Sequence, residues 1–186
     1  MSLLIVDRDG VINEDSDNYI RALEDWNPIP GSIEAIADLS RAGFRIAIAT
    51  NQSGLSRGFF TLDTLEEIHA RLCQLVEEEG GSIAGIFYCP HLPDEGCRCR
   101  KPATGLLQAI EAELGESAVG AYFIGDSLKD LQAAVSHGCL PVLVKTGKGT
   151  DTLALLEADN PDLTQLNGTP VYANLREASR AILKAR

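Results

Sequence analysis

The chain has 186 residues, enough for one domain with a sizeable core, and its 45% apolar and 23% charged residues argue against wholesale disorder. Its formal net charge of −11 argues against nucleic acid or an anionic membrane as a partner, because both require a basic surface. No apolar run approaches the roughly 18 to 20 residues that span a bilayer. The start "MSLLIVDRDG" also lacks the basic region of a signal peptide. We therefore expect a cytoplasmic protein whose five cysteines stay reduced.

Short apolar runs alternate with amphipathic helical patterns along the first three quarters of the chain. The expected strands are 3–7, 44–50, 85–89, 121–126 and 140–145, and the expected helices are 31–42, 61–79, 103–115 and 128–137. Each apolar run is nearly continuous, which is typical of strands buried on both faces of a parallel sheet. Gly43 and Gly138 fall where helices should stop, and Thr61 or Asp63 offers an N-terminal cap. The alternation predicts an α/β protein with a doubly wound, mostly parallel sheet.

The C-terminal part of the chain is harder to interpret. The stretch 150–163 looks helical and is expected to be closed by Asn160 and Pro161. The segment "TPVYANL", residues 169–175, predicts a last edge strand, and 175–184 predicts a final helix. Because no repeat, low-complexity tract or linker divides the sequence, we expect a single domain over residues 1–186.

Polar residues stand at the carboxyl ends of four of the expected strands: Asp7, Thr50, Cys89 and Asp126. Each of them alone could simply be a residue that ends a strand or caps a helix. In an open α/β sheet, however, the carboxyl ends of parallel strands share one edge, and ligands bind there. The set of four therefore indicates a functional site.

Two carboxylates, those of Asp7 and Asp9, lie two residues apart and start on the same side of the chain if it stays extended. Such a pair repels unless a cation lies between, and Mg²⁺ prefers oxygen ligands of this kind. Asp126 could supply a third oxygen, Asp130 could brace the same loop or Lys101, and Lys101 could offset the charge of a phosphate. These groups suit phosphoryl transfer through an aspartyl-phosphate.

The segments "LLIVDRDGVIN", "IATNQSG", "CRKP" and "FIGDSLKDLQAA" match, in order, the four motifs of the haloacid dehalogenase-like (HAD-like) phosphohydrolases, and the chain resembles that family over most of residues 1–150. The resemblance implies that Asp7 is phosphorylated, that Asp9 is the general acid and base, and that Thr50 binds the transferring phosphoryl group. It implies that Lys101 stabilises the charge of the nucleophile, and that Asp126 completes a Mg²⁺ site with Asp7 and the backbone carbonyl of Asp9. Only about 40 residues separate Asp7 from Thr50, so a member without a cap domain is expected.

Three of the cysteines and one histidine crowd into a turn-rich loop, inserted at 89–99: Cys89, His91, Cys97 and Cys99. Four sulfur and nitrogen ligands suit a tetrahedral Zn²⁺, and a site filled entirely by protein is structural. The alternatives are chance clustering of buried thiols or a disulfide such as Cys89–Cys97, which would leave the histidine without a role. We expect the zinc to order the loop and to hold Arg100 and Lys101 over the strand edge. Arg100 could then bind a substrate phosphate or hydroxyl.

Within the family, a zinc loop of this form is similar to those of the heptose bisphosphate phosphatases and the histidinol-phosphate phosphatases. The segment "TNQSGLSRG" resembles the heptose enzymes, in which Arg57 would hold the second phosphate of a sugar bisphosphate. The alternative for Arg57 is a solvated loop residue. The resemblance implies a substrate pocket made by Asn18, Tyr19, Ile20, Arg21, Asn51, Gln52, Ser53, Gly54, Arg57, Arg100 and Ser127.

The expected reaction is therefore Mg²⁺-dependent hydrolysis of the 7-phosphate of a heptose 1,7-bisphosphate, which feeds nucleotide-activated heptose and lipopolysaccharide core synthesis. The alternative in the same class is a histidinol-phosphate phosphatase. Rival interpretations from other classes are a binding module that has lost its chemistry and a zinc module that docks a partner. His69 and His137 lie in helical patterns and are interpreted as surface or packing residues. The protein is expected to be a monomer with a small-molecule substrate.

Overall fold

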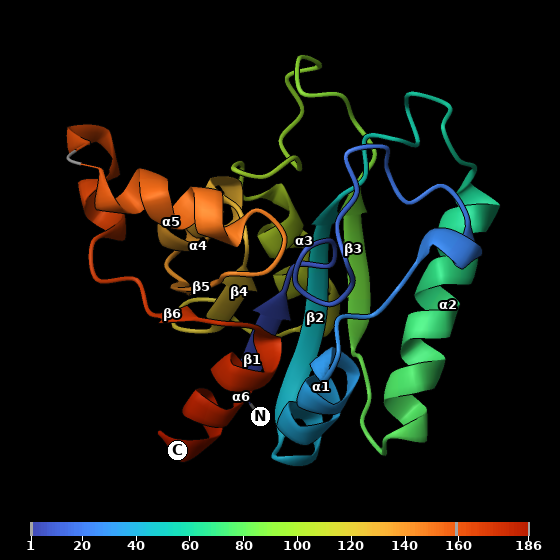
Figure 1. Cartoon of the computed structure of the whole chain (residues 1–186), viewed down its shortest axis with the longest axis horizontal. Coiled ribbons are helices and arrows are strands. Elements are labelled where there is room, and N and C mark those ends of the chain that lie inside the picture. The colour runs from blue at the N-terminus through green and yellow to red at the C-terminus, as the bar shows by residue number, and fades with distance from the viewer. Residues whose placement is uncertain (1, 159, 186) are drawn as a thin grey trace.

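The computed structural model describes residues 2–158 and 160–185, and its centre is a parallel sheet with the strand order β3-β2-β1-β4-β5-β6 (Figure 1). The strands are β1 (Ser2–Val6), β2 (Phe44–Asn51), β3 (Gly85–Cys89), β4 (Tyr122–Gly125), β5 (Leu140–Val144) and β6 (Val171–Tyr172). Chain order reverses direction across the sheet between β1 and β4, which is the switch point at which doubly wound sheets bind ligands. The predicted fold class is confirmed, and the expected edge strand is β6.

Six α-helices connect or follow these strands: α1 (Ser32–Arg41), α2 (Leu62–Glu78), α3 (Gly105–Leu114), α4 (Leu128–His137), α5 (Gly149–Glu157) and α6 (Leu175–Lys184). The expected cap of α2 is confirmed, because the side chain of Thr61 accepts a hydrogen bond from the backbone N–H of Thr64. Gly138 ends α4 with a φ of 89°, the left-handed conformation that glycine adopts without strain.

One predicted helix ends slightly earlier than expected. The sequence predicts a helix from residue 150 that Asn160 and Pro161 close; α5 ends before them, at Glu157, and a separate 3-10 helix, η2, covers Pro161–Leu166. Pro161 lacks a backbone N–H, and its ring disfavours the helical conformation at Asn160. The side chain of Asn160 instead caps η2 by accepting a hydrogen bond from the N–H of Asp162. Asp159, between the two helices, lies outside the described residues.

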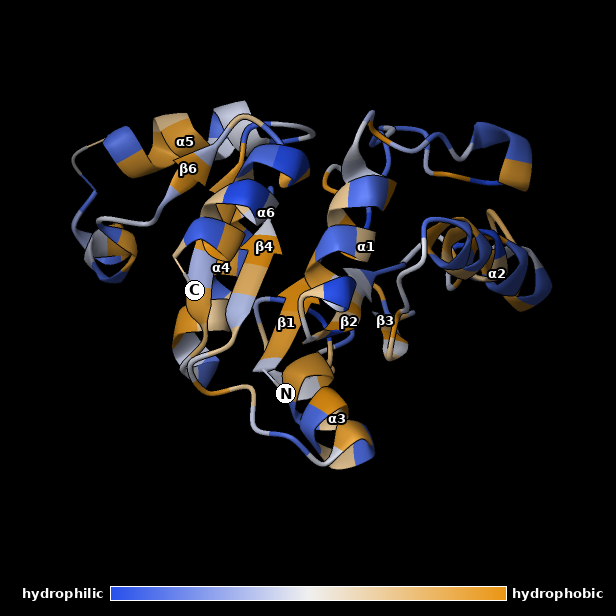
Figure 2. Ribbon diagram, turned by 90° about the horizontal axis from the view of Figure 1, so that it is seen from below, coloured by the Kyte–Doolittle hydropathy of each residue, from blue (hydrophilic) through white to orange (hydrophobic). Residues whose placement is uncertain are grey.

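The core lies on both faces of the sheet. Leu4 and Val6 of β1 pack in the cluster that α1, α2 and α6 cover, whereas Leu3 and Ile5 pack in the cluster that α3 and α4 cover. Figure 2 shows α1 and α6 on one side of the strands and α3 on the other. Burial of successive residues on opposite faces explains why the strands appear in the sequence as unbroken apolar runs.

No cap domain interrupts the connection from β1 to β2, all of which the structure describes. Between Val6 and α1 the chain forms a loop with one short 3-10 helix, η1 (Leu23–Asp25). The carboxyl ends of the strands are therefore covered by loops and by residues of α4 and α5 instead of a cap domain. Figure 1 shows loops rising above the sheet, including the one that follows β3. The expectation of a capless member is confirmed.

The C-terminal segment completes the sheet and one helical layer. β6 pairs with β5 through the register Leu143↔Val171 and Val144↔Tyr172. The buried residues of α6, including Leu175, belong to the same apolar cluster as α1. At the end of the molecule away from the strand carboxyl ends, Ser2 and Ala185 line one shared groove. Among the helices that the structure describes, none has the length and apolar character that crossing a bilayer demands.

Candidate active site

Three of the four polar residues predicted at the strand ends, Asp7, Thr50 and Asp126, line one cleft of about 510 Å³. The fourth, Cys89, lies instead in the cluster of cysteines and histidine. Asp7 follows β1 directly, and its N–H continues the sheet by donating to the carbonyl of Ile124 in β4 at 2.9 Å. Thr50 is the penultimate residue of β2 on one side, and Asp126 follows β4 on the other. All three residues are almost fully buried, with 7%, 1% and 2% of their surface exposed, so their polar atoms face the cleft and one another instead of bulk water.

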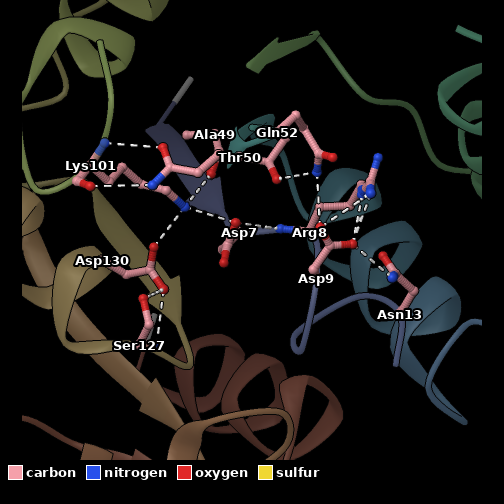
Figure 3. Close-up of polar contacts among 11 residues, drawn as sticks. Asp7, Arg8, Asp9, Asn13, Ala49, Thr50, Gln52, Lys101, Ser127 and Asp130 are labelled. Carbon is pink, nitrogen blue, oxygen red and sulfur yellow. Dashed lines mark hydrogen bonds and ion pairs between the residues drawn. The ribbon is translucent and has the colours of Figure 1, made fainter. Parts of the chain in front are cut away.

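Lys101 lies opposite Asp7, the expected nucleophile. Its ammonium group is 2.8 Å from Asp7 Oδ1 and 2.6 Å from Asp130 Oδ1, and it donates to the carbonyl of Ala49 at 2.8 Å (Figure 3). Burial alone would lower the pKa of Lys101, but the carboxylates of Asp130 and Asp7 outweigh it and raise the pKa above its usual range. Lys101 is therefore a permanent cation in direct contact with Asp7.

Asn51 fixes the backbone of Lys101 in place. The N–H of Lys101 donates to Asn51 Oδ1 at 3.0 Å, and Asn51 Nδ2 donates to the carbonyl of Lys101 at 3.2 Å. Asn51 lines the cleft, as expected of a substrate-binding residue, but both polar atoms of its amide are already used by this pair of bonds. Asn51, the last residue of β2, thus fixes the backbone of Lys101, which follows the loop 89–99.

The carboxyl groups of Asp7, Asp126 and Asp130 bring one oxygen each within 4.8 Å of one another. Asp130 is already engaged by Lys101 and by Ser127, whose N–H and Oγ donate to Asp130 Oδ2 at 3.0 and 2.8 Å. Neither Asp7 Oδ2 nor Asp126 Oδ1 has a hydrogen-bond partner among the residues that the structure describes. The pair therefore offers free oxygens of the kind that Mg²⁺ binds.

The electrostatics of this carboxylate set also favour a cation. Burial, followed by the neighbouring carboxylate of Asp130, raises the pKa of Asp126 to about 7. Burial and the same neighbour raise the pKa of Asp7 well above its ordinary value, against the opposing effect of Lys101. A divalent cation would relieve the repulsion and allow both groups to stay charged. The residues present fit Mg²⁺.

The side chain of Asp9 points away from this set. Arg8 donates from Nε and Nη2 to Asp9 Oδ1 at 3.0 and 2.8 Å, Asn13 donates to Oδ1 at 2.9 Å, and Gln52 donates to Oδ2 at 2.9 Å (Figure 3). Burial raises the pKa of Asp9, but Arg8 and these hydrogen bonds outweigh it and lower the pKa. The expectation that a metal ion separates the carboxylates of Asp7 and Asp9 is wrong, because the backbone bends at Arg8 and the Arg8 guanidinium neutralises Asp9. Coordination through the backbone carbonyl of Asp9 stays a prediction.

The structure brings most, but not all, of the expected substrate residues to the cleft. Those that line it are Tyr19, Ile20, Asn51, Gln52, Ser53, Arg100 and Ser127. Asn18 and Arg21 line a neighbouring hollow, and the guanidinium of Arg21 lies 4.4 Å from the centre of the Phe59 ring. Gly54 packs against Phe60. Arg57 is exposed and does not line the cleft.

Sequence reasoning missed two cations of the cleft, Lys129 and Lys148. Lys148 Nζ lies 3.6 Å from Asp15 Oδ2, and the backbone N–H of Lys148 donates to Asp126 Oδ2 at 2.8 Å. Burial, and then the charges of Arg100 and Lys148, lower the pKa of Lys129. This crowding of like charges is a feature that a bound anion would relieve. The sequence does not reveal that the side chain of Lys129 reaches the cleft, because a lysine in a helical pattern normally indicates an exposed helix face.

The zinc ligands predicted from the sequence converge. Cys89 Sγ lies 3.7 Å from Cys97 Sγ and 3.0 Å from Cys99 Sγ, and His91 Nδ1 lies 3.4 Å from Cys89 Sγ and 3.2 Å from Cys99 Sγ. All four ligand atoms fall within 4.8 Å of one another, which suits a tetrahedral ion with Zn–S bonds of about 2.3 Å. The cysteines are free, and the Cys89–Cys97 separation far exceeds a disulfide bond of about 2.05 Å.

A carboxylate that contacts a buried ammonium group, at the switch point of a parallel sheet, is typical of α/β enzymes that transfer phosphoryl groups through an aspartate. The comparisons with known proteins agree with this class. One matching family model, HAD-hydrolase-like, covers residues 98–178, and another, polynucleotide kinase 3 phosphatase, covers residues 3–137.

Two curated relatives are named D-glycero-beta-D-manno-heptose-1,7-bisphosphate 7-phosphatase. The one from Pseudomonas aeruginosa is 59% identical over 183 residues, which cover 98% of each chain. The one from Pseudomonas putida is 60% identical over 153 residues, which cover 82% of this chain and 87% of the relative. The crystal structure of D,D-heptose 1,7-bisphosphate phosphatase from B. bronchiseptica, complexed with magnesium and phosphate, superposes with a TM-score of 0.92 at 42% identity over the whole of both chains. The chain belongs to the HAD-like hydrolases, in the family of these heptose bisphosphate phosphatases.

Proposed function

We propose that the chain hydrolyses the 7-phosphate of D-glycero-beta-D-manno-heptose 1,7-bisphosphate through an aspartyl-phosphate intermediate. The observation that carries this proposal is the contact between Lys101 and Asp7, 2.8 Å apart and almost fully buried, at the bottom of a cleft lined by further cations. The substrate is inferred from the relatives, since those that are 59% and 60% identical carry the name of this activity.

In the proposed reaction a carboxylate oxygen of Asp7 attacks phosphorus, and the bond from phosphorus to the sugar oxygen breaks. Because Arg8 and its hydrogen bonds lower the pKa of Asp9, this carboxyl group must take up a proton when substrate binds. Asp9 then donates that proton to the departing oxygen and takes a proton from the water that hydrolyses the aspartyl-phosphate, which releases phosphate and restores Asp7. Thr50 binds the transferring group, and Lys101 offsets its charge together with that of Asp7. A Mg²⁺ ion held by Asp7, Asp126 and the backbone carbonyl of Asp9 would neutralise further phosphoryl charge.

We propose that Arg100, Lys129 and Lys148 bind the phosphate that is not transferred. All three line the cleft beside the carboxylate set, whereas Arg57, the cation expected from the sequence, does not. A bisphosphate brings two anionic groups, so it requires a second group of cations in a chain whose net charge is −11. Lys129→Gln should raise KM for the bisphosphate about tenfold and change KM for the corresponding monophosphate much less, as steady-state kinetics would show.

The rival substrate, histidinol phosphate, carries a positive charge of its own. The cleft holds carboxylates such as Asp15, Asp17 and Asp151 beside its cations, so its charge does not select between the two substrates. The sugar bisphosphate is favoured because the relatives at 59% and 60% identity carry the name of that activity. Measurement of kcat/KM for both substrates in Mg²⁺ tests the assignment. A higher kcat/KM for histidinol phosphate would overturn it.

The role of Asp7 is tested by Asp7→Asn. We expect turnover to fall on the order of 10³-fold or more, because an amide cannot form the covalent intermediate. Asp63→Asn, at an exposed site in the first turn of α2, is the matched control and should keep wild-type turnover. A loss of less than about tenfold in Asp7→Asn would point to another nucleophile or to a binding module.

We propose a cytoplasmic monomer that binds neither nucleic acid nor membrane and that carries a structural zinc ion. The free state of the cysteines supports a reducing compartment, and the net charge of −11 opposes polyanionic partners. Light scattering during gel filtration would test the oligomeric state, with a mass close to 20.0 kDa as the expected result.

A further inference from the structure

Arg8 has the largest fully buried side chain in the described part of the chain. In the sequence it stands between Asp7, the proposed nucleophile, and Asp9, the proposed acid and base. A buried guanidinium requires a partner for each of its nitrogens, because an unmatched N–H in the interior is costly. Nε and Nη2 donate to the carboxylate of Asp9. The remaining nitrogen, Nη1, lies 3.1 Å from Nε2 of His69, which comes from the second turn of α2.

The chemistry of the contact fixes the state of His69. A guanidinium can only donate hydrogen bonds, so Nε2 of His69 must accept and the ring must be neutral. Burial, and then the charge of Arg8, lower the pKa of His69 to about 3, so it stays an acceptor at neutral pH. The ring of Tyr88 lies 6.1 Å from that of His69, centre to centre, so β3 adds a neighbour on another side.

We propose that His69 is a positioning residue, which fixes the guanidinium of Arg8 and, through it, the carboxylate of Asp9 beside the cleft. The inference rests on the proposed function, in which Asp9 transfers the proton. Both oxygens of Asp9 accept from Arg8, which is the charged donor among three, since Asn13 and Gln52 also donate to them. A displaced guanidinium would remove the ion pair and leave the carboxylate to the two neutral donors, which alters its position and its charge balance. Small displacements of a catalytic group cost much of its effect, because proton transfer requires contact with the reacting oxygen.

The proposal predicts a loss that depends on the leaving group. A sugar oxygen must gain a proton as it departs, whereas p-nitrophenolate leaves without one. The ratio kcat/KM reports the steps up to the release of the first product. Displacement of Asp9 should therefore lower kcat/KM for the sugar phosphate and leave kcat/KM for p-nitrophenyl phosphate nearly unchanged. General loss of structure would lower both.

The experiment compares two replacements of the histidine on both substrates. His69→Leu cannot accept from Arg8, and we expect its kcat/KM for the heptose bisphosphate to fall about tenfold or more, mainly through kcat, with less than about a threefold change for p-nitrophenyl phosphate. His69→Gln can accept through its amide oxygen and should keep at least about a third of wild-type kcat/KM on both. His137→Leu is the matched control, since His137 on α4 contacts Glu111 away from the cleft.

Three results would overturn the proposal: equal losses on the two substrates in His69→Leu, wild-type kinetics in His69→Leu, or failure of His69→Gln to restore activity. Asp9→Asn should show the same dependence on the leaving group, which separates this inference from the assignment of substrate. If the wild-type protein does not hydrolyse the heptose bisphosphate, the proposed function fails. The comparison then uses any alkyl phosphate that the protein does hydrolyse.

Discussion

Two glycines, Gly10 in the loop after β1 and Gly147 in the loop after β5, lie directly beside the carboxylate of Asp126. Gly10 has a φ of +81° and Gly147 a φ of +55°, and a Cβ atom on either would lie 2.1 or 2.2 Å from Asp126 Oδ2. The left-handed backbone already favours glycine at both positions, and the close approach excludes any side chain. The orientation of this carboxylate therefore depends on residues that contribute no chemistry of their own.

Gly147→Ala should displace Asp126 and weaken Mg²⁺ binding about tenfold or more, as measured by the Mg²⁺ concentration that gives half-maximal activity. Gly120→Ala is the matched control, because Gly120 also has a positive φ, +78°, but a Cβ atom there would meet nothing within 4 Å. Both variants should lose stability from backbone strain of about 1 kcal/mol. Equal Mg²⁺ dependence in the two variants would contradict the prediction.

The raised pKa of Asp126 makes the effect of Mg²⁺ depend on pH. Because the pKa rises from 3.8 to about 7 on folding, the metal-free folded protein keeps a proton that the unfolded chain loses, so its stability falls as pH rises from about 4 to about 7. Mg²⁺ favours the charged form, so the increase in Tm at saturating Mg²⁺ should be larger at pH 8 than at pH 6. An increase that is equal or larger at pH 6, or one that persists in Asp126→Asn, would be inconsistent with this linkage.

At the level of elements, the loop after β3 joins the cluster of candidate zinc ligands to the ammonium group of Lys101. Cys99 is a ligand candidate, and Lys101 follows it after one residue. The N–H of Gly105 donates to the carbonyl of Arg98 at 2.9 Å, so the loop returns to the start of α3 through its backbone. The geometry of the loop thus sets the position of Lys101 against Asp7.

Cys97→Ser should lose zinc, which elemental analysis would show as a fall from about one Zn per chain, and should lower kcat about tenfold or more because Lys101 is less firmly held. Cys73→Ser removes a half-buried thiol of α2 that belongs to no ligand cluster among the described residues, and it should keep both zinc and activity. Full activity in a zinc-free Cys97→Ser protein would separate the loop from catalysis.

The elements that the sequence could predict are those whose environment is uniform along their length. The central strands β1, β2 and β4 are buried on both faces, so each appears as an apolar run, and Asp7 and Asp126 follow directly from the ends of such runs. The contact of His69 with Arg8 and the position of Lys129 in the cleft depend on how α2 and α4 pack on the sheet. A local sequence pattern does not determine that packing. Arg57 is exposed and outside the cleft lining, in agreement with the alternative that it is a solvated loop residue, because a loop sequence does not determine where its side chains point.

For the whole molecule, the segment after α5 is part of the folded structure and distant from the chemistry. Leu175 of α6 is fully buried in the cluster that α1 shares. We expect Leu175→Ala to lower the free energy of unfolding by about 2 to 5 kcal/mol and to leave KM unchanged, with denaturant unfolding as the measurement. Leu62→Ala, at a leucine that is 43% exposed, is the control and should cost far less. We also expect residues 1–186 to unfold in a single transition, as one domain would.

The groove that Ser2 and Ala185 share has a practical consequence. The two ends of the described chain lie near each other, at the side of the sheet opposite the cleft, so a short peptide could join them without crossing the catalytic face. A circularly permuted enzyme, reopened at an exposed loop position such as Gly168, would keep the strand order and every contact of the cleft. Affinity handles or fusion partners attached at either end would likewise leave substrate entry unobstructed.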